Sequence, residues 1–146
     1  CEIVVAGEGP LTEMLKQQTS SRRVHFIGKI SDELLRCYLH ASRVFAFPSV
    51  TKNEAFGVAL AEAMYCHLPA VTFNIPGSGV NWVNENGVTG IEVANGNDEA
   101  FARAIDTLLT NKEQYDRFSH AAFARVSSHF LIKNMVDACE KAYQQL

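Results

Sequence analysis

Short apolar runs alternate with helix-like segments along this 146-residue chain, and this alternation restricts the fold more than any other feature. The runs show little polar alternation, which is typical of strands that are buried on both faces of a sheet. Repeated strand–helix units of this kind predict a parallel sheet with right-handed crossovers. We therefore expect an α/β fold with a Rossmann-like, doubly wound parallel sheet. The predicted strands are EIVVAG (2–7), RVHFIG (23–28), RVFAFPS (43–49), PAVTFN (69–74) and TGIEVA (89–94).

Helices are expected between these strands and after the last one. Ser31 is suited to cap the helix predicted in SDELLRCYLHAS, because a serine oxygen can accept a hydrogen bond from a free amide at a helix start. The stretch that follows the third strand predicts a helix at 55–66. The last three predicted helices cover roughly 98–110, 112–126 and 131–144.

The loops that follow the strands are the candidate site, because ligands of such sheets bind at the carboxyl ends of the strands. Glycine in these loops lets the backbone approach a ligand closely. The loops are GEGP (7–10), GKIS (28–31), PSVTKNEAFG (48–57) and NIPGSGVN (74–81).

The segment NEAFGVALAEAM places two carboxylates, Glu54 and Glu62, on either side of seven uncharged residues. The neighbours of Glu62 are apolar, and a carboxylate in such surroundings is costly unless it is bonded. The amides of Phe56, Gly57 and Val58 have no intrahelical partners, and together with the helix dipole they predict a phosphate site. Eight helical residues rise about 12 Å, so the two carboxylates could hold a sugar and a ribose with a diphosphate between them.

Composition excludes several other classes of function. The net charge of −3 leaves no basic footprint, so we expect no nucleic-acid partner. No apolar run is long enough to span a bilayer. The histidines and the four cysteines show no ligand spacing, so we expect no metal site. Isolated cysteines favour reduced thiols and a cytoplasmic location.

The segment VFAFPSVTKNEAFGVALAEAMYCHLPAVTFN resembles the E-x7-E segment of retaining glycosyltransferases of the GT-B fold, family 4. IVVAGEGP is similar to that family's strand before a G-x-G-P turn. VHFIGKISDELLRCYLHASRVFAFPS is similar to its strand–helix–strand unit before Pro-Ser. NENGVTGIEVANGNDEAFARAIDTLL is similar to its NG-TG-LV-G stretch and the following helix. The resemblance covers nearly the whole chain.

The resemblance implies roles for particular residues. Glu54 would be the catalytic residue and would bind hydroxyls of the donor sugar, and Glu62 would bind the ribose hydroxyls of the nucleotide. The amides of Phe56, Gly57 and Val58 would face the diphosphate and the sugar. The further donor-binding positions would be Gly7, Gly9, Gly28, Lys29 and Ile30, of which Lys29 and Ile30 border the base, and the additional candidates are Asn53, Gly77, Ser78 and Gly79.

The resemblance also implies that residues 1–146 are the nucleotide-sugar donor-binding domain of a longer two-domain enzyme. The family's first strand–helix unit, which carries an Arg and a Lys for the donor phosphates, has no counterpart here, and neither has the acceptor-binding domain. In the usual strand order that unit would supply the central strand. We therefore expect the isolated chain to be inactive. His67 departs from the family's usual Gly at a helix end, where a left-handed backbone is favoured.

The implied reaction uses a UDP-, GDP- or ADP-linked sugar as donor, needs neither metal nor cofactor, and retains the anomeric configuration. The acceptor would be a saccharide or glycolipid bound by the missing N-terminal domain, and lipopolysaccharide or another surface polysaccharide is the favoured product. The full enzyme would work in the cytoplasm, with peripheral association at the inner face of the cytoplasmic membrane as an option.

Three other functions stay open. A GT-B-type sugar-nucleotide epimerase shares the fold and the nucleotide site. The Rossmann-type nucleotide domain of an oxidoreductase requires a third Gly and an acidic residue, and GEGPLT and SRRVHF provide neither. A flavodoxin-like interaction module gives no reason to place Glu62 in an apolar helix.

Overall fold

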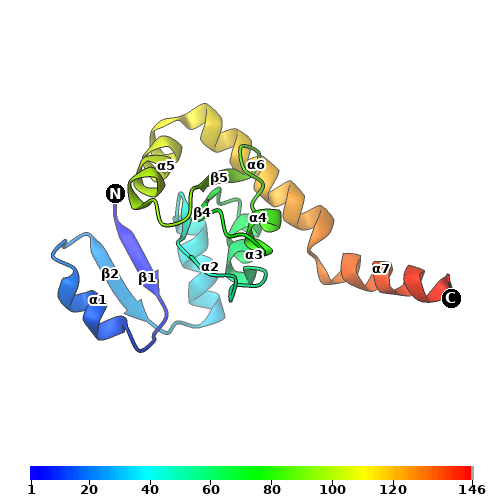
Figure 1. Ribbon diagram of the computed structural model, residues 1–146, viewed down its shortest axis with the longest axis horizontal. Coiled ribbons are helices and arrows are strands. Elements are labelled where there is room, and N and C mark those ends of the chain that lie inside the picture. The colour runs from blue at the N-terminus through cyan, green and yellow to red at the C-terminus, as the bar shows by residue number, and fades with distance from the viewer. Residues whose placement is uncertain (146) are drawn as a thin grey trace. The chain divides into compact units, whose positions relative to one another are not determined.

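A computed structural model describes residues 1–145. The chain divides into two compact units, Cys1–Tyr38 and a second unit that begins at Leu39. Figure 1 labels the helices and strands of both units. The candidate loops 7–10 and 28–31 fall in the first unit, and the loops 48–57 and 74–81 fall in the second.

The first unit is built on two parallel strands joined by a helix. β1 (Ile3–Ala6) pairs with β2 (Val24–Gly28), and α1 (Thr12–Gln18) connects them. α2 (Asp32–Ala41) follows β2 and leads into the second unit. Ser31 precedes α2, and its Oγ accepts a hydrogen bond from an amide in the first turn of that helix, as predicted.

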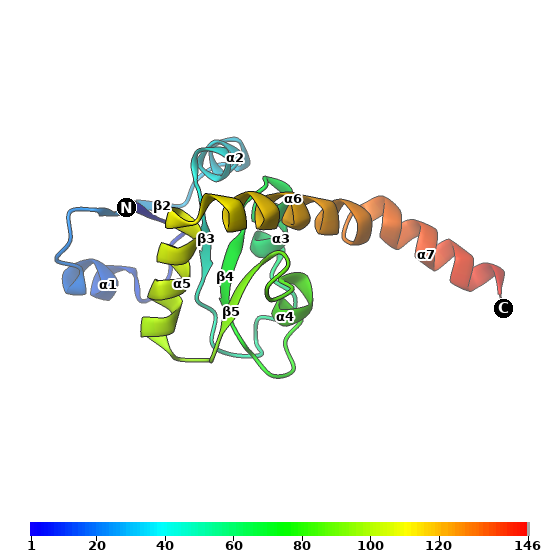
Figure 2. The same ribbon diagram turned by 90° about the horizontal axis from the view of Figure 1, so that it is seen from above.

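The second unit is built on a three-stranded parallel sheet in the order β3–β4–β5. Figure 2 shows α5 on one side of this sheet and α3 and α4 on the other. α6 packs against α3, α5 and β5, and α7 follows it. The elements are β3 (Phe45–Phe47), α3 (Val58–Tyr65), β4 (Ala70–Phe73), α4 (Val80–Val83), β5 (Gly90–Val93), α5 (Asp98–Thr110), α6 (Lys112–His129) and α7 (Ile132–Gln144).

The observed order of elements confirms the predicted α/β fold class, and each observed strand lies inside a predicted one. The helix predicted at 55–66 begins later, at Val58, because Gly57 adopts φ 90°, which no helical residue has. α4 is an addition to the prediction, since four residues are too few to show a helical period.

The hydrophobic core of the second unit joins helices to both faces of the sheet. Leu60 and Met64 of α3 contribute to it together with Val71 of β4, Leu108 of α5 and Phe118 of α6, and all five are fully buried. The apolar face of α3 is therefore fixed against the sheet, and this packing holds in place the helix that begins after Gly57.

Three buried polar side chains link β4 to the chain between α4 and β5. Asn84 Nδ2 donates a hydrogen bond to Thr72 Oγ1 at 2.9 Å, and Thr89 Oγ1 donates to Asn84 Oδ1 at 2.9 Å. Thr89 Oγ1 also accepts from the Glu85 amide at 2.8 Å. Buried polar groups are costly unless they are bonded, so this network fixes the end of α4 against the sheet.

Within residues 1–145, no helix has both the length and the apolar character that crossing a membrane requires. None of the four cysteines, Cys1, Cys37, Cys66 and Cys139, forms a disulfide bond in the part of the chain that the structure describes.

Thr89→Val keeps the shape of the side chain but removes the partner of Asn84 Oδ1 and of the Glu85 amide. We expect it to lower the free energy of unfolding by about 1–3 kcal/mol, because a buried polar group left unsatisfied carries that cost. Urea unfolding followed by circular dichroism measures the change. Thr110→Val is the control, since the Thr110 hydroxyl is exposed and bonds only within α5. Equal losses in both variants would contradict a special role for the buried network.

Candidate functional site

The turn from the loop after β3 into α3 is the centre of the candidate site. Gly57 caps α3 with φ 90° and ψ 62°, in the left-handed region. A Cβ at Gly57 would lie 3.3 Å from the Leu60 Cβ, so both the backbone and the available space favour Gly. Val58, the first residue of α3, is 64% exposed. The start of this helix therefore lies at the protein surface.

Glu54 caps this helix start. Its Oε1 accepts a hydrogen bond from the Gly57 amide at 3.0 Å, in the position where the helix dipole favours a negative charge. The expectation of three free amides is therefore wrong for Gly57, because a nearby carboxylate binds it. Across residues 1–145, the amides of Phe56 and Val58 and the Oε2 atom of Glu54 have no protein partner. These groups remain available to a ligand.

A second loop, residues 74–79, is fastened to this turn. Ser78 Oγ donates a hydrogen bond to the Glu54 carbonyl, and the Gly79 amide donates to the Ala55 carbonyl at 2.8 Å. A Cβ at Gly79 would lie 2.5 Å from that same Ala55 oxygen, so only Gly fits there. The structure thus places these predicted site residues in one pair of linked loops: Asn53, Glu54, Phe56, Gly57, Val58, Gly77, Ser78 and Gly79.

The linked loops carry little net charge of their own. Residues 48–57 and 74–79 contain one lysine, Lys52, and one carboxylate, Glu54. The helix dipole and the free amides are therefore the features that favour an anion at this turn. Residues 1–145 contain no group of three or more His, Cys, Asp or Glu side chains that could hold a metal ion.

Glu62 is exposed, which corrects the expectation of a carboxylate in apolar surroundings. α3 turns its apolar side inward, with Leu60 and Met64 fully buried. Val58 and Tyr65 lie four and three residues from Glu62 and share its exposed side. Because these two residues are apolar although exposed, the sequence of α3 does not show which side of the helix faces the solvent. The surroundings of Glu62 therefore impose no burial cost that a ligand would have to offset, and its ribose-binding role stays a prediction.

The remaining predicted residues lie in the first unit, at the carboxyl ends of β1 and β2. Gly7 follows β1 with φ 112°, and its amide donates to the carbonyl of Gly28, which ends β2 with φ 66°. Gly9 lies in the turn that leads to α1, and Lys29 and Ile30 follow β2. These residues share the edge of the strand pair where ligands of such folds bind. Their contact with a donor stays a prediction.

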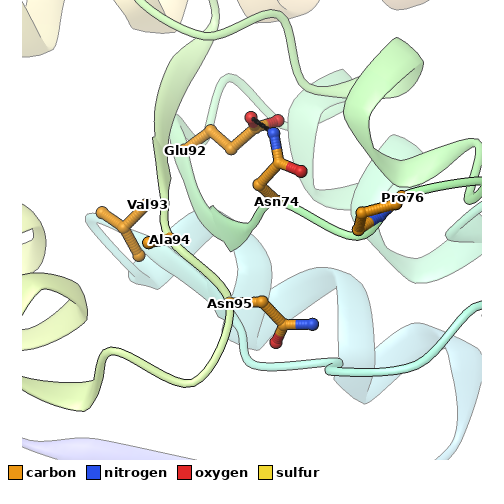
Figure 3. A pocket seen from close by; sticks show the side chains of 6 residues that line it. All are labelled: Asn74, Pro76, Glu92, Val93, Ala94 and Asn95. Carbon is orange, nitrogen blue, oxygen red and sulfur yellow. Dashed lines mark hydrogen bonds between the residues drawn. The ribbon is translucent and has the colours of Figure 1, made fainter.

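A cavity of about 430 Å³ opens at the carboxyl ends of β4 and β5 (Figure 3). Glu92 of β5 accepts hydrogen bonds from the side-chain amides of Asn74 and Asn81. The Asn95 side-chain amide donates to the Val50 carbonyl at 2.9 Å. Oxygen acceptors beside apolar surface suit a ligand that carries hydroxyl groups. The lining residues are Asn74, Pro76, Glu92, Val93, Ala94 and Asn95.

The sequence did not predict this cavity. Asn74 and Pro76 fall in the candidate loop 74–81, and Glu92 and Asn95 fall in the family-like stretch 84–109, but neither Glu92 nor Asn95 was expected to belong to a site. Asn95 comes directly after the last predicted strand. This position could have indicated the cavity, since ligands of parallel sheets bind at the carboxyl ends of the strands.

His67 adopts the left-handed backbone that a helix end favours, with φ 64°, and is the sole non-glycine residue with positive φ in the part of the chain that the structure describes. The His67 amide donates to the Met64 carbonyl at 3.0 Å. The Leu68 amide donates to the Ala63 carbonyl at 3.1 Å, which completes a Schellman motif. The imidazole stacks on the Phe123 ring at 4.2 Å between centroids. These contacts offset the strain and assign His67 a structural role.

Residues 1–125 match the protein family described as glycosyl transferases group 1. The chain is 33% identical over 131 residues to the D-rhamnosyltransferase WbpZ of Pseudomonas aeruginosa, which covers 88% of this chain and 34% of that protein. It is 28% identical over 147 residues to the O-antigen chain mannosyltransferase C of Escherichia coli, which covers 99% of this chain and 39% of that protein. The chain thus spans well under half the length of these relatives.

Solved structures share the fold of this chain. Anabaena Alr3699/HepE in complex with UDP and glucose gives a TM-score of 0.87 at 23% identity, and the match covers 99% of this chain and 41% of that one. Sucrose-phosphate synthase from Thermosynechococcus elongatus gives a TM-score of 0.84 at 24% identity, and covers 99% of this chain and 38% of that one. These likenesses confirm the predicted fold class.

Gly79→Ala places a methyl group against the Ala55 carbonyl, so the two linked loops must separate. We expect the free energy of unfolding to fall by about 1–3 kcal/mol, because extra atoms in a closely packed contact destabilise a protein by about that amount. We also expect the amide NMR signals of residues 54–58 to shift. Gly77→Asn is the control, because a Cβ at Gly77 meets nothing within 4 Å and Asn tolerates φ 80°. Equally large shifts in the control would show that the contact at Gly79 does not hold the loops.

Proposed function

The chain belongs to the glycosyl transferases group 1 family, and from that membership we propose that it binds the sugar donor of a GT-B glycosyltransferase of family 4. The donor is a sugar linked to UDP, GDP or ADP. The proposed reaction retains the anomeric configuration and needs neither metal nor cofactor. The observation that carries the proposal is the start of α3, where the amides of Phe56 and Val58 are free among the described residues and Glu54 lies beside them.

The free amides suit the diphosphate of the donor, because a helix start favours negative charge and presents N–H donors. Transfer of the sugar requires that the departing nucleoside diphosphate be stabilised. Amides that are already held in place do this without rearranging during the reaction. The left-handed backbone of Gly57 and the bonds from Ser78 and Gly79 hold this turn.

The two carboxylates suit hydroxyl groups. Glu54 retains Oε2 for the donor sugar, since the described contacts occupy only Oε1. Glu62 lies on the exposed side of α3, where a carboxylate can accept hydrogen bonds from both ribose hydroxyls. In the first unit, the donor-binding positions would be Gly7, Gly9, Gly28, Lys29 and Ile30, with Lys29 and Ile30 beside the base.

The names of the relatives support a saccharide substrate. One is named a D-rhamnosyltransferase and another an O-antigen chain mannosyltransferase, and the Anabaena structure contains UDP and glucose. We propose that the acceptor is a saccharide or glycolipid of a surface polysaccharide. We place the enzyme in the cytoplasm, in peripheral association with the membrane where its acceptor is a glycolipid.

We propose that the chain is the donor half of a longer two-domain enzyme, because it spans 34% and 39% of the two relatives. The exposure of β1 supports this proposal. Ile3, Val4 and Val5 are 49%, 42% and 36% exposed, although apolar parallel strands are normally covered. A further strand–helix unit outside this chain would pair with β1 as the central strand.

Glu62→Gln is expected to weaken the binding of UDP or GDP about tenfold or more, because hydrogen bonds to a charged group contribute about 1.5–3 kcal/mol. Isothermal titration calorimetry measures the dissociation constants. For a 2′,3′-dideoxy nucleotide the variant and the wild type should bind alike, because the hydroxyls that Glu62 contacts are absent.

Glu113→Gln is the matched control for that substitution, since Glu113 is also an exposed helical carboxylate, in the first turn of α6. It should bind nucleotides as the wild type does. Equal affinity of Glu62→Gln and the wild type for UDP and GDP would reject the ribose role. Tight binding of NAD without binding of any nucleoside diphosphate would support the oxidoreductase alternative instead.

The isolated chain is expected not to turn over UDP-glucose or GDP-mannose, because the acceptor site and the first strand–helix unit lie outside it. A coupled spectrophotometric assay that monitors release of the nucleoside diphosphate, with and without an added saccharide, measures the turnover. A rate above that of the buffer alone would refute the proposal that this chain is only the donor half.

A further inference from the structure

Three aromatic rings meet beside the turn at Gly57. The centroid of the Phe56 ring lies 5.4 Å from that of Phe130 and 6.3 Å from that of Trp82. The Trp82 and Phe130 centroids are 4.8 Å apart. All three pairs meet edge to face, the arrangement that the charge distribution of aromatic rings favours. Phe56 comes from the turn before α3, Trp82 from α4, and Phe130 from the end of α6.

Arg125 of α6 fixes the Trp82 side of this cluster. Its Nε donates to the Val83 carbonyl at 3.1 Å, and a second guanidinium N–H donates to the Trp82 carbonyl. A third bond joins the guanidinium to the Glu85 carboxylate at 2.9 Å. The Arg125 side chain is 17% exposed. Helix ends leave carbonyls without partners, so these bonds lock the end of α4 to α6.

The ring contacts of Phe56 add to the hydrogen bonds that already hold this turn, in which the Gly57 amide donates to Glu54 and the Gly57 carbonyl accepts from the Ala61 amide. Glycine adopts positive and negative φ with similar ease, so the peptide beside it can turn unless something else holds it. The ring contacts with Trp82 and Phe130 hold the Phe56 side chain. They therefore also restrict the directions of the amides on either side of Gly57.

We propose that Phe130 and Trp82 are positioning residues for the donor diphosphate, because they hold the Phe56 ring and so aim the amides of Phe56 and Val58. This inference rests on the proposed function of those amides. In this proposal both residues act through Phe56 and not by contact with the donor. The inference gives the end of α6 a role in donor binding, although the sequence-predicted site includes no residue of that helix.

Phe130→Ala tests this inference. We expect it to weaken the binding of UDP and GDP about 5- to 10-fold, because the loss of edge-to-face ring contacts corresponds to a change in affinity of about that size. We also expect faster amide hydrogen exchange in residues 54–60, measured by mass spectrometry without nucleotide. Phe130→Tyr keeps the ring and should return both quantities to wild-type values.

Phe123→Ala is the matched control. Phe123 also lies on α6, is half-buried, and contacts two rings, Tyr65 at 5.3 Å and His67 at 4.2 Å. Its ring contacts do not include Phe56. We therefore expect Phe123→Ala to leave both the nucleotide affinities and the exchange of residues 54–60 unchanged.

Two results would overturn the positioning role: unchanged exchange of residues 54–60 in Phe130→Ala, or the same change in Phe123→Ala. Failure of the proposed function looks different, because the wild type would then bind neither UDP nor GDP. The exchange measurement, which needs no nucleotide, would still show whether Phe130 holds the turn.

Discussion

The left-handed backbone at Gly57 is the constraint on which the rest of the site depends. It turns the chain abruptly into α3, so that the helix begins at the surface with the exposed residue Val58. Only Gly reaches this conformation at little cost, and a Cβ at this position would lie 3.3 Å from the Leu60 Cβ, so Leu60 would have to shift slightly. The same turn brings Glu54 back to the Gly57 amide. The anion-binding role proposed for the loop thus depends on one backbone geometry.

A glycine turn is not rigid by itself, and remote parts of the second unit hold this one. Ser78 and Gly79 bond to backbone carbonyls of the turn, and rings from α4 and α6 hold Phe56. Asn84 fixes the far end of α4 to the sheet. Each restraint comes from a segment distant in the sequence, so the geometry of the site is a product of tertiary packing.

The fold was predictable because continuous apolar runs mark buried parallel strands, and the two linked loops were predictable because they follow such strands. The orientation of Glu62 was not, because Val58 and Tyr65 are apolar yet exposed and hide the helical period. The capping of Gly57 was missed because it depends on a side-chain rotamer. The cavity at Glu92 was missed because it depends on which strands are neighbours.

In the sequence, Glu54 and Glu62 are two carboxylates that could each bind hydroxyl groups in the same way. In the structure, the two side chains are restrained differently. The capping bond to Gly57 already fixes the Glu54 carboxylate, so the cap and the sugar contact are compatible uses of its two oxygens. Glu62 is exposed and has no such restraint among the described residues. Ordering a free Glu side chain costs up to about 2 kcal/mol. In the proposed roles, Glu54 is therefore preorganised to orient a sugar, whereas Glu62 would add affinity only after that ordering cost is met.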